Sequence, residues 1–167
     1  MRLASLYSGG KDSTYSIFEI GKLRHDVACL ISIIPEISDS LLFHFPNIHL
    51  TRVLAQAIDL PIRDFKSKNS SLENELAVLE NALSSAKDEF GIEGIGQGGI
   101  SSNYQKGNFE KICSDLELSV FSPLWNLNPS NYLRRMIDEK FKIIITSVSA
   151  MGLDREWLGM QLDHESI

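Results

Sequence analysis

Residues 2–13 read RLASLYSGGKDS, and this stretch decides the fold. Its first half is an apolar run of strand length, and its second half places a pair of glycines ahead of an amphipathic segment. Ser13 can cap a helix that starts here. A strand that passes through a glycine turn into a helix is the opening unit of a parallel α/β sheet. We therefore expect the first strand-to-helix junction of such a sheet at residues 8–13.

Apolar runs of strand length and longer amphipathic stretches alternate along the rest of the chain. Strands are expected at residues 2–7, 27–34, 61–65, 92–95, 119–121 and 142–148. Residues typical of helix starts stand between them, at Asn47, Ser70, Ser102 and Asn128. Several strands are apolar almost throughout, as in parallel sheets covered on both faces. The pattern predicts an α/β fold, a Rossmann-like open parallel sheet of order 3-2-1-4-5 with helices on both faces.

Length and composition limit the classes of protein to which the chain can belong. Its 167 residues, 43% of them hydrophobic, fit one globular domain. Cys29 and Cys113 form no CxxC pair, which argues against a zinc ribbon or a secreted disulfide framework and predicts a cytoplasmic protein. The net charge of −6, with scattered basic residues, argues against DNA as a partner. No signal-peptide pattern and no run of roughly 20 apolar residues predicts membrane insertion.

Residues 8–13, SGGKDS, have the composition of an anion-binding loop. The glycines allow turns that expose N–H groups, the serines add hydroxyl donors, and a helix N-terminus adds partial positive charge. The loop is not a Walker A motif, because Ser5 and Asp12 stand where that motif needs glycine and Ser or Thr. A triphosphate or pyrophosphate is the expected ligand, and a plain glycine turn is the alternative. The candidate phosphate-binding residues are Ser8, Gly9, Gly10, Lys11, Asp12 and Ser13.

A second glycine cluster, GIGQGG at residues 94–99, follows the fourth expected strand. It matches the dinucleotide-binding pattern GxGxxG, but Asp115 and Glu117 precede the next strand, whereas that pattern wants an acidic residue at the end of the strand. In a sheet of order 3-2-1-4-5 the first and fourth strands flank the crevice where ligands bind. Both glycine clusters should open into this crevice, which places Gly98 beside the ligand.

The SGGKDS loop resembles the pyrophosphate-binding loop of the N-type ATP pyrophosphatases, the PP-loop superfamily. Further stretches are similar to its diphthine–ammonia ligase branch, namely residues 38–40, 43–47, 98–105, 123–125 and 153–159. The resemblance spans almost the whole chain and implies an adenine nucleotide alpha hydrolase-like fold. It also implies that residues 1–167 are a single PP-loop ATP-binding domain. The family's C-terminal substrate segment, with its Glu-Gly-Gly-Glu motif, is expected to be absent or not included.

The resemblance implies a reaction known in archaea and eukaryotes. ATP, with Mg²⁺, would activate diphthine on translation elongation factor 2 as an acyl-adenylate, and ammonium would then supply the amide nitrogen. Lys11 and Asp12 would be catalytic, Lys11 by offsetting charge on the departing pyrophosphate and Asp12 by holding Mg²⁺. Backbone groups of residues 30–32, that is Leu30, Ile31 and Ser32, would meet adenine. The acyl substrate would face His44, Ser101, Tyr104 and Gln105.

Two alternatives to this function stay open. The chain can be another amidating or tRNA-modifying ATP pyrophosphatase, which the acceptor that stimulates AMP release would distinguish. It can also be a non-catalytic module that binds ATP or AMP. Cys113 stands at helical spacing from Phe109 and Leu116, so we expect a buried thiol rather than a nucleophile. The sequence leaves the ammonia source and the oligomeric state open, a homodimer included.

Overall fold

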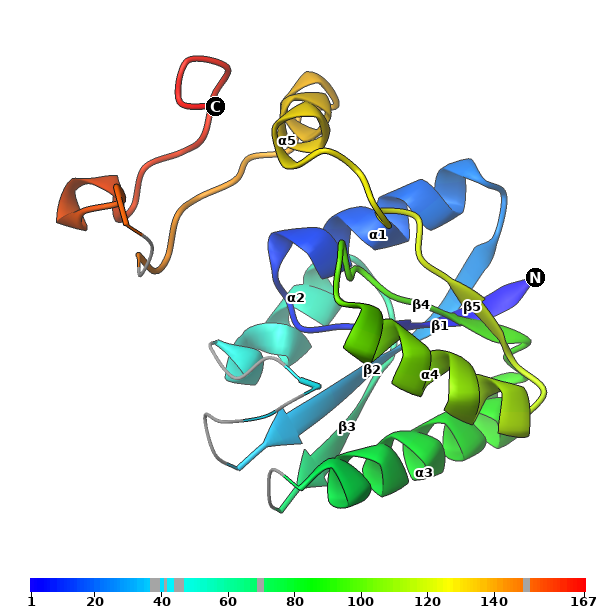
Figure 1. The fold of residues 1–167 in the computed structure, drawn as a ribbon. Coiled ribbons are helices and arrows are strands. Elements are labelled where there is room, and N and C mark those ends of the chain that lie inside the picture. Colours follow the sequence, from blue (N-terminus) through cyan, green and yellow to red (C-terminus); the bar gives the residue numbers. More distant parts are fainter. Residues whose placement is uncertain (37–39, 41, 44–46, 69–70, 149–150) are drawn as a thin grey trace. The chain divides into compact units, whose positions relative to one another are not determined.

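A computed structural model describes residues 1–36, 40, 42–43, 47–68, 71–148 and 151–167 (Figure 1). The contacts of the chain divide it into two compact units, Met1–Trp125 and Asn126–Ile167, where the sequence analysis expects one domain. Asn126, the first residue of the second unit, has a φ of 57°, in the left-handed region. Among the described helices, none is both long enough and apolar enough to cross a membrane.

The first unit is built on a five-stranded sheet of order β3-β2-β1-β4-β5, as predicted. Every neighbouring pair of strands is parallel. The strands are β1 (Arg2–Leu6), β2 (Asp26–Pro35), β3 (Ile62–Ser67), β4 (Gly94–Gly96) and β5 (Ser119–Phe121). The fifth strand has the predicted bounds, β1 starts at the predicted residue, and every other strand end differs from prediction by one or two residues.

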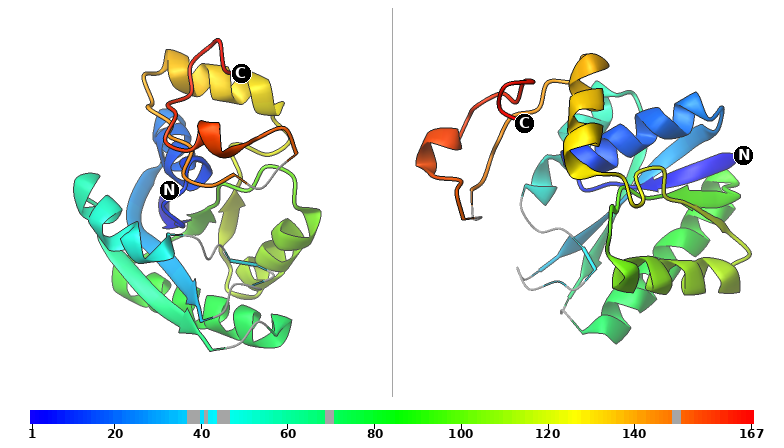
Figure 2. Two further views of the ribbon diagram at one scale, coloured as in Figure 1. Left: turned by 90° about the vertical axis from the view of Figure 1, so that its left-hand side faces the viewer. Right: turned by 45° about the horizontal axis from the view of Figure 1, so that its top comes forward.

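Helices cover both faces of this sheet (Figures 1 and 2). They are α1 (Lys11–Lys22), α2 (Thr51–Ala57) after the short 3₁₀ helix η1 (Ile48–Leu50), α3 (Leu72–Phe90) and α4 (Asn103–Asp115). The chain runs outward from β1 through β2 to β3 and then returns to β4 and β5. Because crossovers between parallel strands are right-handed, α1 and α2 lie on one face and α3 and α4 on the other.

Each face of the sheet has its own apolar layer. The larger layer, under α3 and α4, includes Ile31, Ile33, Leu79, Leu83 and Phe109. The smaller layer includes Tyr7, Leu30 and Ala55. Leu30 and Ile31, which are successive residues of β2, thus enter opposite layers, which explains why the strand is apolar over most of its length.

Helix starts confirm two of the predicted caps. The Ser102 side chain accepts a hydrogen bond from the Gln105 N–H at the start of α4. Asn128 accepts one from Asn131 ahead of α5 (Pro129–Asp138). Both serve N–H groups that a helix leaves unpaired at its N-terminus.

The other helix starts differ from prediction. Ser70 lies outside the described residues, and α3 is capped by Ser71, which accepts from the Asn74 N–H. Asn47 makes no capping hydrogen bond, so that prediction was wrong. Its φ of 59° turns the chain into η1 instead, a left-handed conformation that asparagine tolerates better than most residues.

The second unit contains α5 and the 3₁₀ helix η2 (Arg155–Trp157). The strand predicted at residues 142–148 does not form there, so that prediction was wrong. Ile144 makes only an isolated antiparallel bridge to Gln161, and the Gly159 N–H donates to the Ile145 carbonyl. An apolar run becomes a strand only where a neighbouring segment pairs with it along its length, and here the pairing is a single bridge.

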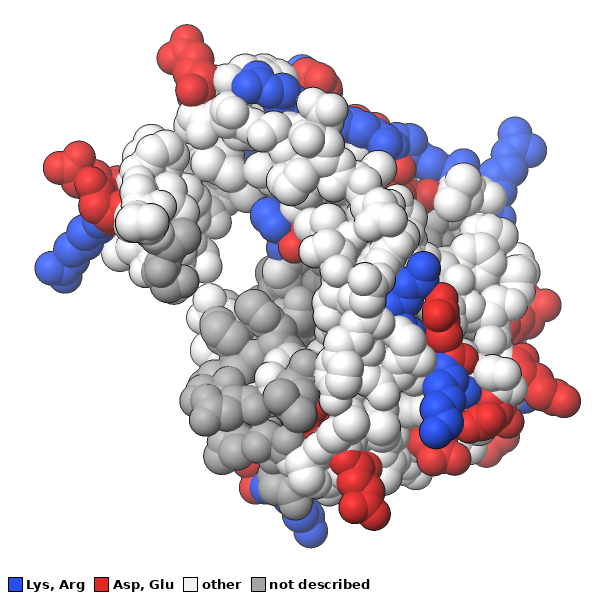
Figure 3. All heavy atoms as spheres, viewed as in Figure 1, with Lys and Arg blue, Asp and Glu red and all other residues white. Residues whose placement is uncertain are grey.

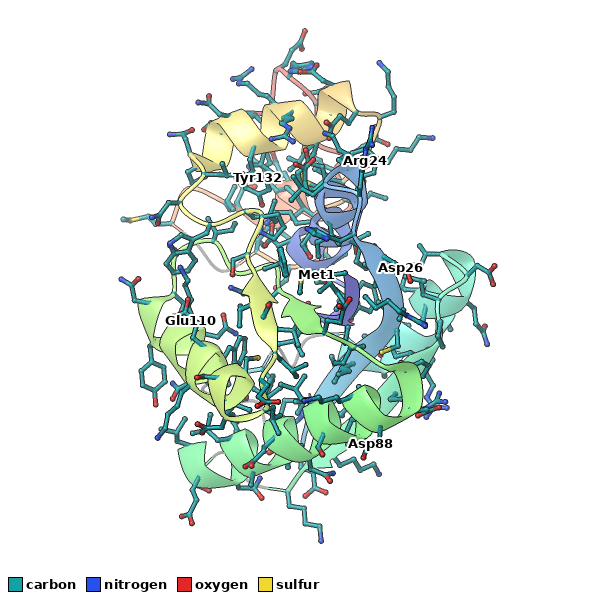
Figure 4. The ribbon with its side chains drawn as sticks, turned by 90° about the vertical axis from the view of Figure 1, so that its right-hand side faces the viewer. Met1, Arg24, Asp26, Asp88, Glu110 and Tyr132 are labelled. Atoms are coloured by element: carbon teal, nitrogen blue, oxygen red, sulfur yellow. The ribbon has the colours of Figure 1, made fainter. Side chains whose placement is uncertain are left out.

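The amino and carboxyl ends of the strands in this sheet have different surroundings. Met1 and Asp26 lie at the amino ends of β1 and β2 (Figure 4), where the Asp26 N–H donates to the Met1 carbonyl at 3.0 Å. At the opposite, carboxyl ends of the strands, β1 leads into residues 7–10 and β4 leads into residues 97–102. These connections diverge to opposite faces of the sheet, and ligands bind at such a switch point in parallel α/β folds.

Candidate functional site

The loop after β1 opens directly into a helix. Gly9 has a φ of 75°, in the left-handed region, and Gly10 is the extended N-cap of α1. The predicted cap Ser13 was wrong, because α1 begins two residues earlier at Lys11 and Ser13 lies in its first turn, where its hydroxyl donates to the Gly10 carbonyl at 3.1 Å. Gly10 has no side chain with which to cap the helix. An uncapped helix N-terminus presents N–H groups and a positive dipole end to an anion.

Two hydroxyl groups stand at this helix end. Ser8 Oγ and Ser13 Oγ lie 3.2 Å apart, and the Gly10 N–H donates to Ser8 Oγ at 3.4 Å. Ser8, Gly10, Asp12 and Ser13 all line one cavity of about 240 Å³. Gly9 is not among the lining residues. A β-carbon there would lie 2.8 Å from Leu54 Cδ1, so this glycine packs beneath the loop.

Lys11 and Asp12 form an ion pair in the first turn of α1, where Asp12 lines the cavity and Lys11 is not among the lining residues. Lys11 Nζ lies 2.8 Å from Asp12 Oδ1 and 2.9 Å from Oδ2. Both side chains are about one-third exposed, at 38% and 33%, so water screens the pair and its net contribution to stability is small. On the face shown in Figure 3, Lys and Arg side chains lie beside Asp and Glu side chains rather than in a separate stripe.

The second glycine cluster forms the opposite side of the cavity. Gly98 and Gly99 line it together with Gln97. A β-carbon on Gly98 would lie 2.7 Å from the Asp12 carbonyl carbon and oxygen and from the Ser13 nitrogen. The structure therefore brings Gly98 into contact with the first turn of α1, beside the residues predicted to bind phosphate.

The predicted adenine contacts on β2 divide between the two faces of the sheet. The side chains of Ile31 and Ile33 line the cavity. Leu30 and Ser32 are buried on the other face, with Ser32 Oγ 3.5 Å from Thr51 Oγ1. Pairing of β1 with β2 ends near Ile31, whose carbonyl accepts from the Tyr7 N–H at 2.8 Å, whereas β2 continues to Pro35. Ile33 thus lines the cavity at a point on β2 beyond the end of its pairing with β1.

An apolar wall completes the cavity. Leu42, Phe43, Ile48 and Phe109 line it, and the rings of Phe43 and Phe109 stack with centroids 6.3 Å apart. The Leu42 peptide is held by a side chain from each of two helices. Its N–H donates to Glu75 Oε2 at 3.0 Å, and its carbonyl accepts from Gln105 Nε2 at 2.6 Å.

The residues predicted to face the acyl substrate lie in different surroundings. Gln105 lines the cavity, although its amide is engaged with Leu42. Ser101 and Tyr104 are exposed and lie outside the cavity lining, with Tyr104 53% exposed. His44 lies outside the described residues.

Two family models match the chain in succession. Residues 1–120 match the diphthamide synthase N-terminal domain, and residues 128–167 match the diphthamide synthase C-terminal domain. The chain belongs to the diphthamide synthase family. The boundary between the two matched regions coincides with the boundary between the two compact units, at residues 125–126.

Relatives of this diphthamide synthase family chain carry the name diphthine–ammonia ligase. The mouse protein is 33% identical over 92% of the chain, and the human protein is 31% identical over 98%. The relative from Saccharomyces cerevisiae is 30% identical over 97% of the chain. The chain spans 64% of the length of the mouse relative, 68% of the human one and 28% of the yeast one.

A solved structure shows the same fold. It is described as a predicted subunit of a tRNA methyltransferase from Methanocaldococcus jannaschii, and it superimposes with a TM-score of 0.57 over 90% of this chain and 81% of that one. The sequence identity is 18%, so the likeness concerns the fold alone.

The two cysteines of this diphthamide synthase family chain are not among the residues that line the cavity. Cys29 and Cys113 are free and buried, as predicted for Cys113. Burial raises the pKa of the Cys29 thiol to about 11, with a smaller contribution from the Glu89 carboxylate, and burial raises the pKa of the Cys113 thiol to about 12. Both thiols are protonated near neutral pH, so neither is a nucleophile.

These raised pKa values predict a pH dependence of stability. Above pH 9 the unfolded chain releases the thiol protons while the folded chain keeps them, so the free energy of unfolding falls as the pH rises towards 11. Each thiol contributes a slope of up to about 1.4 kcal/mol per pH unit. Urea unfolding of the wild type and of Cys113→Ala between pH 8 and pH 10.5 measures this, and the variant should show the shallower slope. Equal slopes would contradict the prediction.

The apolar wall was not predicted, and neither were two buried polar residues in or next to the cavity, Gln97 and Glu75. Gln97 lines the cavity inside the second glycine cluster, where its place directly after a strand is the only pattern that points to it. Glu75 is fully buried, and no described residue donates to its Oε1. It reads in the sequence as an ordinary acidic residue in the first turn of a helix, and only the packing of α3 shows its contact with Leu42.

Proposed function

We propose that the chain is an ATP-dependent diphthine–ammonia ligase, which amidates diphthine on translation elongation factor 2 and releases AMP and pyrophosphate. The cavity at the switch point carries the proposal, because it sets an uncapped helix N-terminus and two hydroxyls against an apolar wall. Such a cavity suits a ligand that is anionic at one end and planar and apolar at the other. The names of the mouse and human relatives support the choice of reaction.

The phosphates of ATP would lie at the start of α1. Ser8, Gly10 and Ser13 line the cavity here, and Gly9 shapes the turn. Their N–H and hydroxyl groups would bind the β and γ phosphates. Lys11 would leave Asp12 and offset the charge that grows on pyrophosphate as it departs. Such preorganised positive charge lowers the barrier without covalent chemistry.

The residues present fit a Mg²⁺ ion that arrives with ATP. Asp12 is the one carboxylate among the described residues that line the cavity. The described residues contain no group of three or more potential ligands that could hold a metal unaided. Mg²⁺ commonly uses one or two carboxylates together with substrate phosphates and water. Asp12 would hold the ion, which when bound would neutralise phosphate charge.

The adenine would lie along β2, between the sheet and the apolar wall. Ile31 and Ile33 line this part of the cavity with Leu42 and Phe43. Adenine offers a flat apolar face to such side chains and hydrogen-bonding edges to a backbone. The backbone of β2 beyond the end of β1 would meet those edges, in and just beyond the predicted range of residues 30–32.

The reaction would proceed in two displacements. A carboxylate oxygen of diphthine attacks the α phosphorus, the α–β bond breaks, and pyrophosphate leaves from the loop at residues 8–13. Ammonia, formed when ammonium loses a proton to water, attacks the acyl carbon; the nitrogen then loses a second proton to water, and AMP departs with the former carboxylate oxygen. The site would hold acceptor and nucleotide together, which converts the first step into a reaction within one complex.

The proposal is tested by identifying the products that form from ATP. We expect incubation with ATP, Mg²⁺, ammonium and diphthine-bearing elongation factor to yield AMP and pyrophosphate in equal amounts, together with amidated factor detected by mass spectrometry. Reactions without the factor or without ammonium are the controls. Release of ADP and phosphate would contradict the mechanism. Nucleotide binding without AMP release would favour a binding module, and AMP release stimulated by a different acceptor would favour another ATP pyrophosphatase.

A further inference from the structure

Gln97 is a buried polar residue at the end of β4 to which the proposed reaction assigns no role. It is 3% exposed and lines the cavity. Its Oε1 accepts the Gly99 N–H at 2.7 Å, and its Nε2 donates to Ser122 Oγ at 2.7 Å. Its own N–H donates to the Phe121 carbonyl at 2.9 Å. These bonds fix the amide in one orientation, because turning it would leave buried polar groups unpaired.

Gly98 lies between these anchors and the first turn of α1. The peptide that joins it to Gly99 carries the N–H that Gln97 binds. On its other side, the space for a β-carbon is already taken by the backbone of Asp12 and Ser13, at 2.7 Å. Gln97 thus holds the second glycine cluster where it touches the phosphate loop.

Positions 97 and 99 are coupled through the hydrogen bond between the Gly99 N–H and Gln97 Oε1. A β-carbon there would lie 2.4 Å from Gln97 Oε1. A side chain at position 99 and the amide of Gln97 cannot both keep their places, because one must move to relieve the overlap. A change at either position therefore breaks the same hydrogen bond.

We propose that Gln97 is a positioning residue for the pyrophosphate end of ATP. It holds the Gly98–Gly99 peptide against the first turn of α1 and so sets the width of the cavity beside Ser13. The inference rests on the proposed function, because it takes the phosphates of ATP to lie at residues 8–13. Loss of this support should weaken ligands that contain pyrophosphate and spare AMP, whereas a general loss of structure would weaken both.

Calorimetric titration of the 167-residue chain with inorganic pyrophosphate and, separately, with AMP tests this inference. Gln97→Met keeps the volume of the side chain and loses both of its hydrogen bonds. We expect its pyrophosphate affinity to fall about tenfold and its AMP affinity to stay within about twofold of the wild type. Ser122→Ala, which removes one of these bonds, should lower pyrophosphate affinity about threefold. The exposed Gln56→Met on α2 is the matched control and should change neither affinity.

A double-mutant cycle supplies a second readout. Gly99→Ala should weaken pyrophosphate binding in the wild-type background and add nothing in the Gln97→Ala background. Independent effects in the cycle, or an equal loss of AMP affinity in Gln97→Met, would overturn the inference while leaving the proposed function intact. A wild-type chain that binds neither ATP nor pyrophosphate would instead overturn the proposed function, and the inference with it.

Discussion

Lys11→Ala is expected to lower kcat/KM for AMP formation by about 10²–10³-fold, the loss typical when a group that stabilises transition-state charge is removed. The side chain carries a full positive charge at the start of α1, within 2.8 Å of Asp12. Charge accumulates on the β phosphate as the α–β bond breaks, so the loss should fall mainly on kcat. Steady-state release of pyrophosphate measures it. Because Lys11 is exposed, the thermal midpoint should stay close to that of the wild type.

Lys22→Ala is the matched control for this variant. Lys22 belongs to the last turn of the same helix and pairs with Glu19 at 3.0 Å. Its replacement removes the same charge at the other end of α1, so AMP formation should remain at the wild-type rate. A Lys11→Ala enzyme that keeps wild-type kcat would show that the charge at residue 11 has no part in the reaction.

Gly98→Ala is expected to abolish tight ATP binding. The added methyl group would lie 2.7 Å from the backbone of Asp12 and Ser13, which cannot turn aside as a flexible side chain can. The first turn of α1 must move, and the phosphate loop moves with it. We expect at least about a tenfold loss of ATP affinity by calorimetry, and a loss of about 1–3 kcal/mol in the free energy of unfolding in urea.

Gly107→Ala makes the same chemical change at a site with room for it. Gly107 lies inside α4, and apart from its chain neighbours and the backbone of its own helix no atom of the described residues lies within 4 Å of an added β-carbon. Alanine is a better helix former, so this variant should gain up to about 1 kcal/mol of stability and bind ATP as the wild type does. Wild-type ATP affinity in Gly98→Ala would show that the glycine cluster does not border the phosphate site.

Most strands of the sheet and the starts of two helices could be predicted, because the sequence signals for them lie within a few residues of each element. The apolar run of β2 and the capping residues Ser102 and Asn128 each act within a few residues of the chain. The strand order then followed from the rules of crossover connections, which leave few topologies open. The segment 142–148 is as apolar as a strand, yet it failed as one, because pairing depends on a partner that local sequence does not name.

The site was only partly predictable, for a related reason. The glycines and serines of residues 8–13 predict a phosphate-binding loop, because their composition and their place after a strand are typical of one. Side-chain direction on β2 could not be read from a strand with apolar residues on both faces, and only the structure shows that Ile31 lines the cavity while Ser32 packs beside Thr51 on the other face. The backbone contacts to adenine expected at residues 30–32 stay a prediction. Gln105 lines the cavity, but its Nε2 donates to the Leu42 carbonyl, a contact that no local pattern predicts.

The amino-acid sequence was sufficient to predict the α/β class, because hydrophobic periodicity and turn chemistry act along short stretches of chain. The rules of crossover connections then led to the strand order. Phosphate binding by residues 8–13 stays a prediction. Tertiary structure alone decided that Gly98 touches Asp12, that Gln97 binds Gly99 and Ser122, and that Glu75 and Gln105 hold Leu42. Most of these contacts join residues far apart in the chain. Their geometry depends on how helices pack across a finished sheet, and no local pattern encodes that packing.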